Sequence, residues 1–191
     1  MKKTLVIFDC FGVIVGEIAP VIFRKYFSAE EAARIKDEVC RPADLGIISE
    51  QELYDSVGAA IGESAEFVRA EYERMGCVNK SILPIIEKLG QRADIALLSN
   101  AMPGFADRLL DRFCLKPLFD KIFLSCEHNM VKPDPSYYRL CVDSFGKEYE
   151  RIFMIDDNPD NLLPLEAMGI KPVLFKSAES ITENLELKKL L

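Results

Sequence analysis

The stretch Leu5-Val6-Ile7-Phe8-Asp9-Cys10-Phe11-Gly12 decides the fold. Its first four residues are apolar without any polar alternation, and an aspartate ends the run. Such runs are typical of strands covered on both faces of a parallel sheet. Similar short apolar runs recur at residues 94–98, 122–124, 152–155 and 172–175. Helical patterns separate these runs, so the sequence predicts an α/β fold with a doubly wound parallel sheet.

Helix start signals support this alternation. Asp134-Pro135 and Asn158-Pro159 each pair an N-cap residue with a proline suited to the first helical position. Residues 16–75 break the rhythm because they carry helix signals only, among them two capping boxes and a further N-cap serine: Ser28-x-x-Glu31, Ser49-x-x-Glu52 and Ser64. An insert after the first strand stands above the strand ends, where open α/β sheets bind ligands. We therefore expect an α/β core of residues 1–15 and 76–191 and a helical cap of residues 16–75.

Polar residues follow the predicted strands. They are Asp9 after the first strand, Ser99 and Asn100 after the second, Lys132 before the next helix, and Asp156 and Asp157 at the end of the fourth. Each alone has an ordinary structural explanation, as a turn aspartate, loop residues, a solvated lysine and an acidic helix start. Parallel strands end at one edge of the sheet, so these side chains are expected to meet there. Adjacent carboxylates repel each other, which favours a bound hard cation with oxygen ligands.

Composition restricts the class of protein. The chain has 191 residues, a formal net charge of −7 and no long basic run, so we expect no nucleic-acid partner. No apolar run reaches the length of a membrane span or of a signal peptide, so no membrane association is expected. The 6 cysteines are scattered without a CxxC pair, which favours a cytoplasmic protein with neither a zinc site nor a disulfide framework. None of these features predicts an oligomeric state.

Four motifs together resemble the haloacid dehalogenase (HAD) superfamily. In chain order they are Ile7-Phe8-Asp9-Cys10-Phe11-Gly12-Val13-Ile14, Leu98-Ser99-Asn100, Lys132-Pro133-Asp134, and Ile155-Asp156-Asp157-Asn158 through Asn161. The Leu45-Gly46-Ile47-Ile48-Ser49 turn and the Asp-Asp-Asn-x-x-Asn string resemble the branch with sugar-1-phosphate phosphatases and the phosphatase domain of soluble epoxide hydrolase. The resemblance implies a Rossmann-like core with a small helical cap and a hydrolase activity.

The resemblance also implies a role for each site residue. Asp9 would attack the phosphorus of a small phosphorylated metabolite and form an aspartyl-phosphate. Mg²⁺ would be the cofactor, held by Asp9, the backbone carbonyl of Phe11 and Asp157, with Asp156 assisting directly or through water. The transferred phosphoryl group would be bound by Gly12, Ser99, Asn100 and Lys132. Lys132 would also neutralise the nucleophile, as phosphoryl transfer mostly needs positioning and charge neutralisation.

The chain departs from the family pattern at Phe11, where the phosphatases have an aspartate. That aspartate protonates the leaving alkoxide and then deprotonates the attacking water, which phenylalanine cannot do. Acid–base catalysis is worth roughly 10²–10⁴ in rate, so alkyl phosphates should be poor substrates unless a cap residue replaces the acid. The candidates are Asp44, Glu17 and Glu52. We expect Phe11 to pack against apolar cap residues.

Two other functions stay open. A metal-independent haloacid dehalogenase also lacks this aspartate, and it would need Arg24 or Arg41 from the cap to hold a carboxylate. A non-catalytic protein would bind a phosphorylated ligand or a partner and would have lost turnover through Phe11. His128 has no companion at the spacing of a catalytic triad, and Cys10 is expected to be a buried structural thiol.

Overall fold

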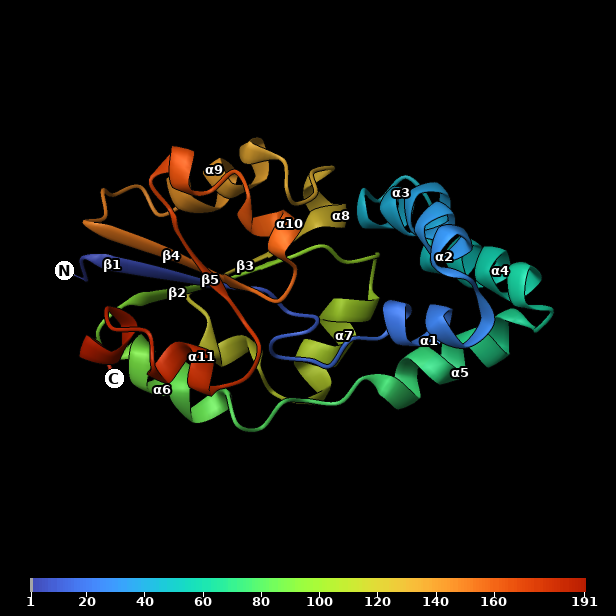
Figure 1. Cartoon of the computed structure of the whole chain (residues 1–191), viewed down its shortest axis with the longest axis horizontal. Coiled ribbons are helices and arrows are strands. Elements are labelled where there is room, and N and C mark those ends of the chain that lie inside the picture. The colour runs from blue at the N-terminus through green and yellow to red at the C-terminus, as the bar shows by residue number, and fades with distance from the viewer. Residues whose placement is uncertain (1) are drawn as a thin grey trace.

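The protein has a parallel five-stranded sheet in the order β3-β2-β1-β4-β5 (Figure 1). This computed structural model describes residues 2–191. The strands are β1 (Thr4–Phe8), β2 (Asp94–Ser99), β3 (Lys121–Leu124), β4 (Arg151–Asp156) and β5 (Lys171–Leu174). They match the predicted apolar runs, so the predicted fold class is confirmed. From β1 the chain adds β2 and β3 on one side of the sheet, and then β4 and β5 on the other side. The strand order therefore reverses between β1 and β4, and a ligand site is expected beside the carboxyl ends of these two strands.

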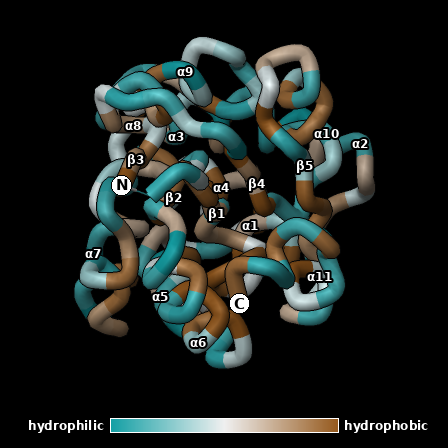
Figure 2. The backbone as a smooth tube through the Cα atoms, turned by 90° about the vertical axis from the view of Figure 1, so that its left-hand side faces the viewer, coloured by the Kyte–Doolittle hydropathy of each residue, from teal (hydrophilic) through white to brown (hydrophobic). Residues whose placement is uncertain are grey.

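Helices cover both faces of the sheet. In Figure 1, α6 (Leu83–Gly90), α7 (Phe105–Arg112) and α11 (Glu179–Thr182) lie below it, and α8 (Ser125–His128), α9 (Pro135–Asp143) and α10 (Pro159–Leu162) lie above it. Short helical turns at Lys116–Leu118, Glu166–Met168 and Leu187–Lys189 complete this part. Val6 and Phe8 belong to one buried cluster, whereas Leu5 and Ile7 belong to another. Figure 2 shows the apolar strands enclosed by more polar outer segments. Burial on both faces explains why these strands are apolar without alternation.

The helix starts follow the predicted caps. Ser28 and Ser49 each form a complete capping box, and Ser64, Asp134 and Asn158 each accept a hydrogen bond from a first-turn amide. These side chains satisfy amides that have no partner inside the helix. Each contact is local in sequence, which is why it can be predicted without the tertiary structure.

The segment between β1 and α6 is helical apart from its two ends and short connections. It contains α1 (Ala19–Tyr26), α2 (Ala29–Ile35), a π-helical turn at Lys36–Cys40, α3 (Arg41–Asp44), α4 (Glu50–Ile61) and α5 (Ala65–Met75). These helices lie beyond the carboxyl ends of the strands, on the right in Figure 1. The two connections to the sheet run side by side, since Val15 bridges Val78, and Gly16 N–H donates to the Cys77 carbonyl at 3.0 Å. The expected cap boundaries at residues 16 and 75 lie next to these two connecting segments.

Ion pairs join this helical segment to the core. Arg108 of α7 donates to both carboxylate oxygens of Glu50 at 2.5 and 2.9 Å and to Glu73 at 3.1 Å. A bidentate guanidinium–carboxylate pair fixes orientation better than a single contact. Among residues 2–191, no helix combines the length and the apolar character needed to cross a bilayer.

Candidate active site

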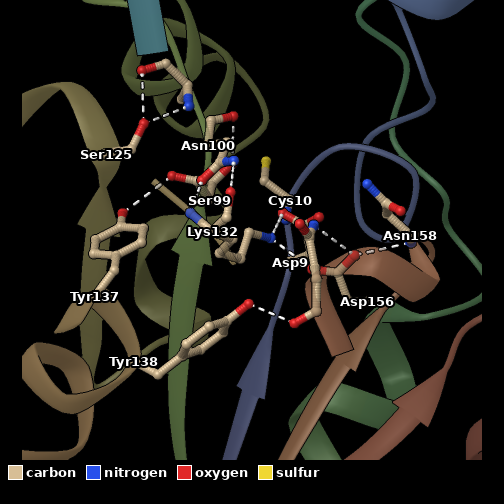
Figure 3. A network of polar contacts seen from close by, with 12 residues as sticks. Asp9, Cys10, Ser99, Asn100, Ser125, Lys132, Tyr137, Tyr138, Asp156 and Asn158 are labelled. Atoms are coloured by element: carbon tan, nitrogen blue, oxygen red, sulfur yellow. Dashed lines mark hydrogen bonds and ion pairs between the residues drawn. The ribbon is translucent and has the colours of Figure 1, made fainter. Parts of the chain in front are cut away.

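Three carboxylates converge where β1 and β4 end. Asp9 directly follows β1, Asp156 ends β4, and Asp157 comes next in the chain. One oxygen of each lies within 4.8 Å of the others. Asp9 and Asp156 are buried, while Asp157 is partly exposed. Figure 3 shows Asp9 and Asp156 facing each other across the strand ends.

Lys132 lies between two of these carboxylates. Its Nζ is 2.8 Å from Asp9 Oδ1 and 2.7 Å from Asp156 Oδ2, and its side chain is fully buried. Burial lowers the pKa of Lys132, but the two carboxylates outweigh burial and raise that pKa above its usual value. The ammonium therefore stays charged beside the nucleophile candidate.

The loop that carries Lys132 is held by Asn100. The Asn100 side chain donates to the Lys132 carbonyl at 3.0 Å and accepts from the Lys132 amide at 2.8 Å. Ser99 is buried at the end of β2, its hydroxyl donates to the Asn100 carbonyl at 3.3 Å, and its own carbonyl accepts from Tyr137 at 3.1 Å. The side chain of Asn100 thus positions a lysine that is 32 residues away in the chain.

Asp156 is held by hydrogen bonds in addition to its ion pair. It accepts from the Asn158 amide at 2.9 Å, and the Asn161 side chain donates to both of its oxygens at 3.1 Å. The Asn161 carbonyl in turn accepts from Tyr138 at 2.5 Å. Sequence reasoning did not give Asn161 or Tyr138 a role at the site. Asn161 did stand in the fourth motif, whereas no local pattern indicated Tyr138.

Gly12 makes room for Asp157. Its φ is +81°, and a Cβ at this position would lie 2.3 Å from Asp157 Cγ. Its amide already donates to the Val15 carbonyl at 2.7 Å, so that N–H is used within the loop. Glu17 lies close to Asp157, and burial, followed by the Asp157 charge, raises the pKa of Glu17.

The donor set fits a hard divalent cation. Burial raises the pKa of Asp9, Lys132 opposes that rise, and the Asp156 and Asp157 charges add to it. Three carboxylates beside one ammonium leave an excess of negative charge at a buried position. A cation with oxygen ligands would relieve that excess.

Comparison with known proteins agrees with this geometry. A family model for the haloacid dehalogenase-like hydrolases matches residues 3–169. The chain belongs to the haloacid dehalogenase-like hydrolase family. The predicted family and its hydrolase class are confirmed.

Individual relatives extend this comparison. Bifunctional epoxide hydrolase 2 of Sus scrofa is 32% identical over 72 residues, which are 38% of this chain and 13% of that protein, so the predicted likeness to soluble epoxide hydrolase is confirmed. A HAD family enzyme from Bacteroides thetaiotaomicron, in complex with magnesium and inorganic phosphate, superposes with a TM-score of 0.73 at 23% identity, over 92% of this chain and 95% of that one. L-2-haloacid dehalogenase from Xanthobacter autotrophicus, with chloropropionic acid covalently bound, superposes with a TM-score of 0.64 at 17% identity, over 100% of this chain and 85% of that one. At these identities the two superpositions show a shared fold.

Phe11 of this HAD-like hydrolase packs against a buried cluster formed by both core and cap residues. Its ring stacks on Phe105 of α7, with centroids 6.1 Å apart and planes 9° from parallel. The cap side chain Tyr72 meets the Phe105 ring edge-on at 5.6 Å. Phe11 thus stacks on a core ring, while the buried cluster that it joins includes cap residues such as Ile22 and Tyr54. The expected packing of Phe11 on cap side chains stays a prediction.

Other candidates lie away from the carboxylate cluster. Glu52 is exposed, and its carboxylate closes the Ser49 capping box, accepting from the Ser49 amide at 2.7 Å. Arg24 and Arg41 are both exposed. His128 lies against the rings of Phe123 and Tyr137. Cys10 is fully buried, and burial raises the pKa of its thiol far above the usual value.

Proposed function

We propose that this HAD-like hydrolase is a Mg²⁺-dependent phosphatase of a small phosphorylated metabolite and acts through an aspartyl-phosphate on Asp9. The observation that carries the proposal is the position of Lys132, buried between Asp9 and Asp156, with Asp157 beside them. A buried ammonium that contacts a nucleophilic carboxylate is suited to hold an anionic substrate against it. The magnesium and phosphate bound to the Bacteroides enzyme of the same fold support this chemistry.

The chain's own residues orient the nucleophile. Asp9 Oδ1 contacts Lys132 and accepts from the Cys10 amide at 2.6 Å, so the carboxylate has a fixed orientation. An Asp9 oxygen forms a bond to phosphorus while the bond from phosphorus to the leaving oxygen breaks. Water then attacks phosphorus, and Asp9 is released as a carboxylate. Lys132 stays bound to the phosphoryl oxygens through both steps and balances their charge.

The predicted metal ligands remain part of this proposal. Asp9, the Phe11 carbonyl and Asp157 would hold Mg²⁺, which neutralises charge on the transferred group when bound. Asp156 already accepts hydrogen bonds from Asn158 and Asn161, so we assign it to anchoring Lys132 and to assisting the metal from beside it. Gly12 serves by leaving space for Asp157.

We also propose that residues 16–75 act as a cap that sets substrate choice. Their helices lie beyond the strand ends that carry the site (Figure 1). A cap in this place contacts the part of the substrate that is not transferred. A cytoplasmic location and the absence of a nucleic-acid partner stay predictions from composition.

A screen of phosphate esters with and without Mg²⁺ tests the proposed function. We expect turnover of at least one ester that needs Mg²⁺ and is lost in Asp9→Asn, whereas the exposed control Asp37→Asn stays active. Single turnover of acetyl phosphate should leave one hydroxylamine-sensitive phosphoryl group per chain. If no ester is turned over and no phosphoryl group is captured, the phosphatase proposal is wrong and phospho-ligand binding without turnover becomes the better account.

A dehalogenase is the second candidate because a haloacid dehalogenase shares the fold. This candidate would need Arg24 or Arg41 to hold the haloacid carboxylate, and both side chains are exposed. Release of chloride from 2-chloropropionate in the presence of EDTA would establish it instead.

A further inference from the structure

The proposed phosphatase lacks a proton donor at residue 11, and the structure docks the backbone of a cap aspartate, Asp44, in the same neighbourhood. Phe11 packs against a small apolar cluster that includes Ala101 and Cys126. The hydroxyl of Ser125 accepts from the Ala101 amide at 2.9 Å and donates to the Asp44 carbonyl at 2.5 Å. Asp44, the last residue of α3, is therefore docked on the loop against which Phe11 packs.

Local backbone features fix this docking. The run from α2 to α3 contains Pro42, which cannot donate to the preceding turn and whose ring clashes with it. The helix widens just before Pro42 into the π-helical turn Lys36–Cys40, where the Arg41 amide donates to the Lys36 carbonyl. π-Helical turns occur frequently at functional sites. Beyond α3, the Asn129 side chain donates to the Leu45 carbonyl at 2.7 Å, so two core side chains hold this end of the cap.

The Asp44 residue is partly buried, and positive side chains act on its carboxyl. Burial raises its pKa to about 7, and Lys36, Lys132 and Arg41 oppose that rise. Lys132 is the lysine that contacts Asp9, so the Asp44 carboxyl lies within electrostatic range of the nucleophile's partner. The charged groups that act on the Asp44 carboxyl are Lys36, Arg41 and Lys132. The charge of Asp44 in turn raises the pKa of Cys40, Tyr72 and Cys126.

A second cap side chain, Tyr72, has a buried hydroxyl. Tyr72 is 4% exposed, and within residues 2–191 its hydroxyl has no hydrogen-bond partner. Burial raises the pKa of this hydroxyl, and the charges of Cys40, Tyr54 and Asp44 add to that rise. Buried hydroxyls in native proteins almost always have a partner. A ligand oxygen at this position would supply it.

Other parts of the chain do not compete with Asp44 for this role. Glu17 interacts with Asp157 and belongs to the metal side of the site. Glu52 is committed to its capping box on the exposed face of α4. Tyr72 itself holds its proton too tightly to act as an acid, and it remains a hydrogen-bond donor.

We propose that Asp44 of the cap is the catalytic acid and base that replaces the missing aspartate at Phe11, with Tyr72 donating a hydrogen bond to a substrate oxygen beside it. This inference rests on the proposed phosphatase function. When Asp9 attacks phosphorus, the leaving oxygen takes the Asp44 proton, which yields the alcohol, the aspartyl-phosphate and the Asp44 carboxylate. That carboxylate then takes a proton from water, whose oxygen attacks phosphorus. Asp9 and inorganic phosphate are released, and Asp44 is protonated again.

The test compares leaving groups in Asp44→Asn with Mg²⁺ present. The leaving alcohol of glycerol 3-phosphate needs a proton, whereas p-nitrophenolate leaves without one. We expect kcat for glycerol 3-phosphate to fall by roughly 10²–10⁴-fold, and kcat for p-nitrophenyl phosphate to fall by less than about 10-fold. Asp37→Asn, an exposed aspartate of the same helical run, is the matched control and should leave both rates unchanged.

A rescue variant and a pH profile complete the test. Phe11→Asp in the Asp44→Asn background should restore hydrolysis of glycerol 3-phosphate, because a carboxyl returns to the leaving oxygen. In the wild type, kcat/KM for glycerol 3-phosphate should fall above about pH 7, where Asp44 loses its proton. That decline should be absent for p-nitrophenyl phosphate, and this measurement stands even if a variant fails to fold.

The outcomes separate the two proposals. Three results would overturn the role of Asp44 and leave the phosphatase proposal intact. They are an equal loss of kcat on both substrates in Asp44→Asn, no loss of kcat on either substrate, and identical pH profiles for the two substrates in the wild type. A wild type that turns over neither these esters nor acetyl phosphate would overturn the phosphatase proposal, and the role of Asp44 with it.

Discussion

Replacing Lys132 by methionine removes the charge at the centre of the site and keeps most of the side-chain volume. The lysine contacts Asp9 and Asp156 at 2.8 and 2.7 Å with no solvent exposure of its side chain. Breaking a buried ion pair by removing one partner costs about 3–5 kcal/mol, because the remaining charge stays buried. For a chain of this size, about 1 kcal/mol shifts Tm by about 2–4 °C, so we expect Lys132→Met to melt roughly 6–20 °C below the wild type.

The loss of stability in Lys132→Met should depend on pH. Burial already raises the pKa of Asp9, and Lys132 lowers it, so removing Lys132 raises it further. A carboxyl whose folded pKa exceeds its unfolded value destabilises the fold above the folded pKa, and this penalty disappears below the unfolded pKa. Wild-type Lys132, with its raised pKa, contributes fully below its unfolded pKa and loses that contribution only at alkaline pH. The deficit of Lys132→Met should therefore be largest at neutral pH and shrink towards about pH 4.

Thermal melts from pH 4 to pH 8 measure this dependence, and Lys116→Met is the matched control. Lys116 Nζ also contacts two carboxylates, Asp107 and Asp111, at 2.8 Å each, but all three side chains are exposed. Exposed pairs of this kind contribute about 0–1 kcal/mol. A deficit in Lys132→Met that matches Lys116→Met, or that does not change with pH, would refute the electrostatic account of the site.

Three further variants test other parts of the site. Asp157→Ala should lose the stabilisation by Mg²⁺ in thermal melts, and an unchanged Mg²⁺ affinity in calorimetry would contradict its role as a ligand. Asn100→Ala removes both hydrogen bonds to the Lys132 backbone, so we expect urea denaturation to show a loss of about 1–3 kcal/mol together with a lower kcat; an unchanged kcat would show that the loop is held without Asn100. Phe11→Asp alone loses the stacking on Phe105 and should be less stable by about 3–5 kcal/mol, with little gain on glycerol 3-phosphate while Asp44 is intact. A gain of 100-fold or more on that ester in otherwise wild-type protein, about the lower bound of acid–base catalysis, would show that Asp44 does not supply the proton.

The fold could be predicted from the sequence because its determinants are short-range. Leu5 to Phe8 are apolar at every position, since Val6 and Phe8 join one buried cluster and Leu5 and Ile7 the other. Ser28 and Ser49 cap helices through contacts only three residues away. Patterns of this kind are visible without knowing what packs against them.

For the site, only the features that follow from the strand topology could be predicted. Parallel strands bring Asp9 and Asp156 to one edge regardless of side-chain detail. The side-chain contacts were not predictable in the same way. Asn100 holds Lys132, and Tyr138 supports Asn161 across 23 residues. The stacking of Phe11 on Phe105 was not predicted, because it depends on how α7 packs.

The choice among Asp44, Glu17 and Glu52 shows where tertiary structure becomes decisive. All three are acidic residues in or beside the cap helices, and no sequence pattern ranks them. The carboxylate of Glu52 is held by a local contact, its capping box, and Glu17 lies beside the proposed metal ligand Asp157. Asp44 remains because Ser125 and Asn129, which both follow β3, bind the backbone around it, and Lys132 lies close enough to influence its carboxyl. A chain that has phenylalanine at residue 11 can thus keep an acid at the leaving group, provided that the cap is docked when phosphorus is attacked. Proton transfer would then require a closed cap, which couples the chemistry to the segment proposed to select the substrate.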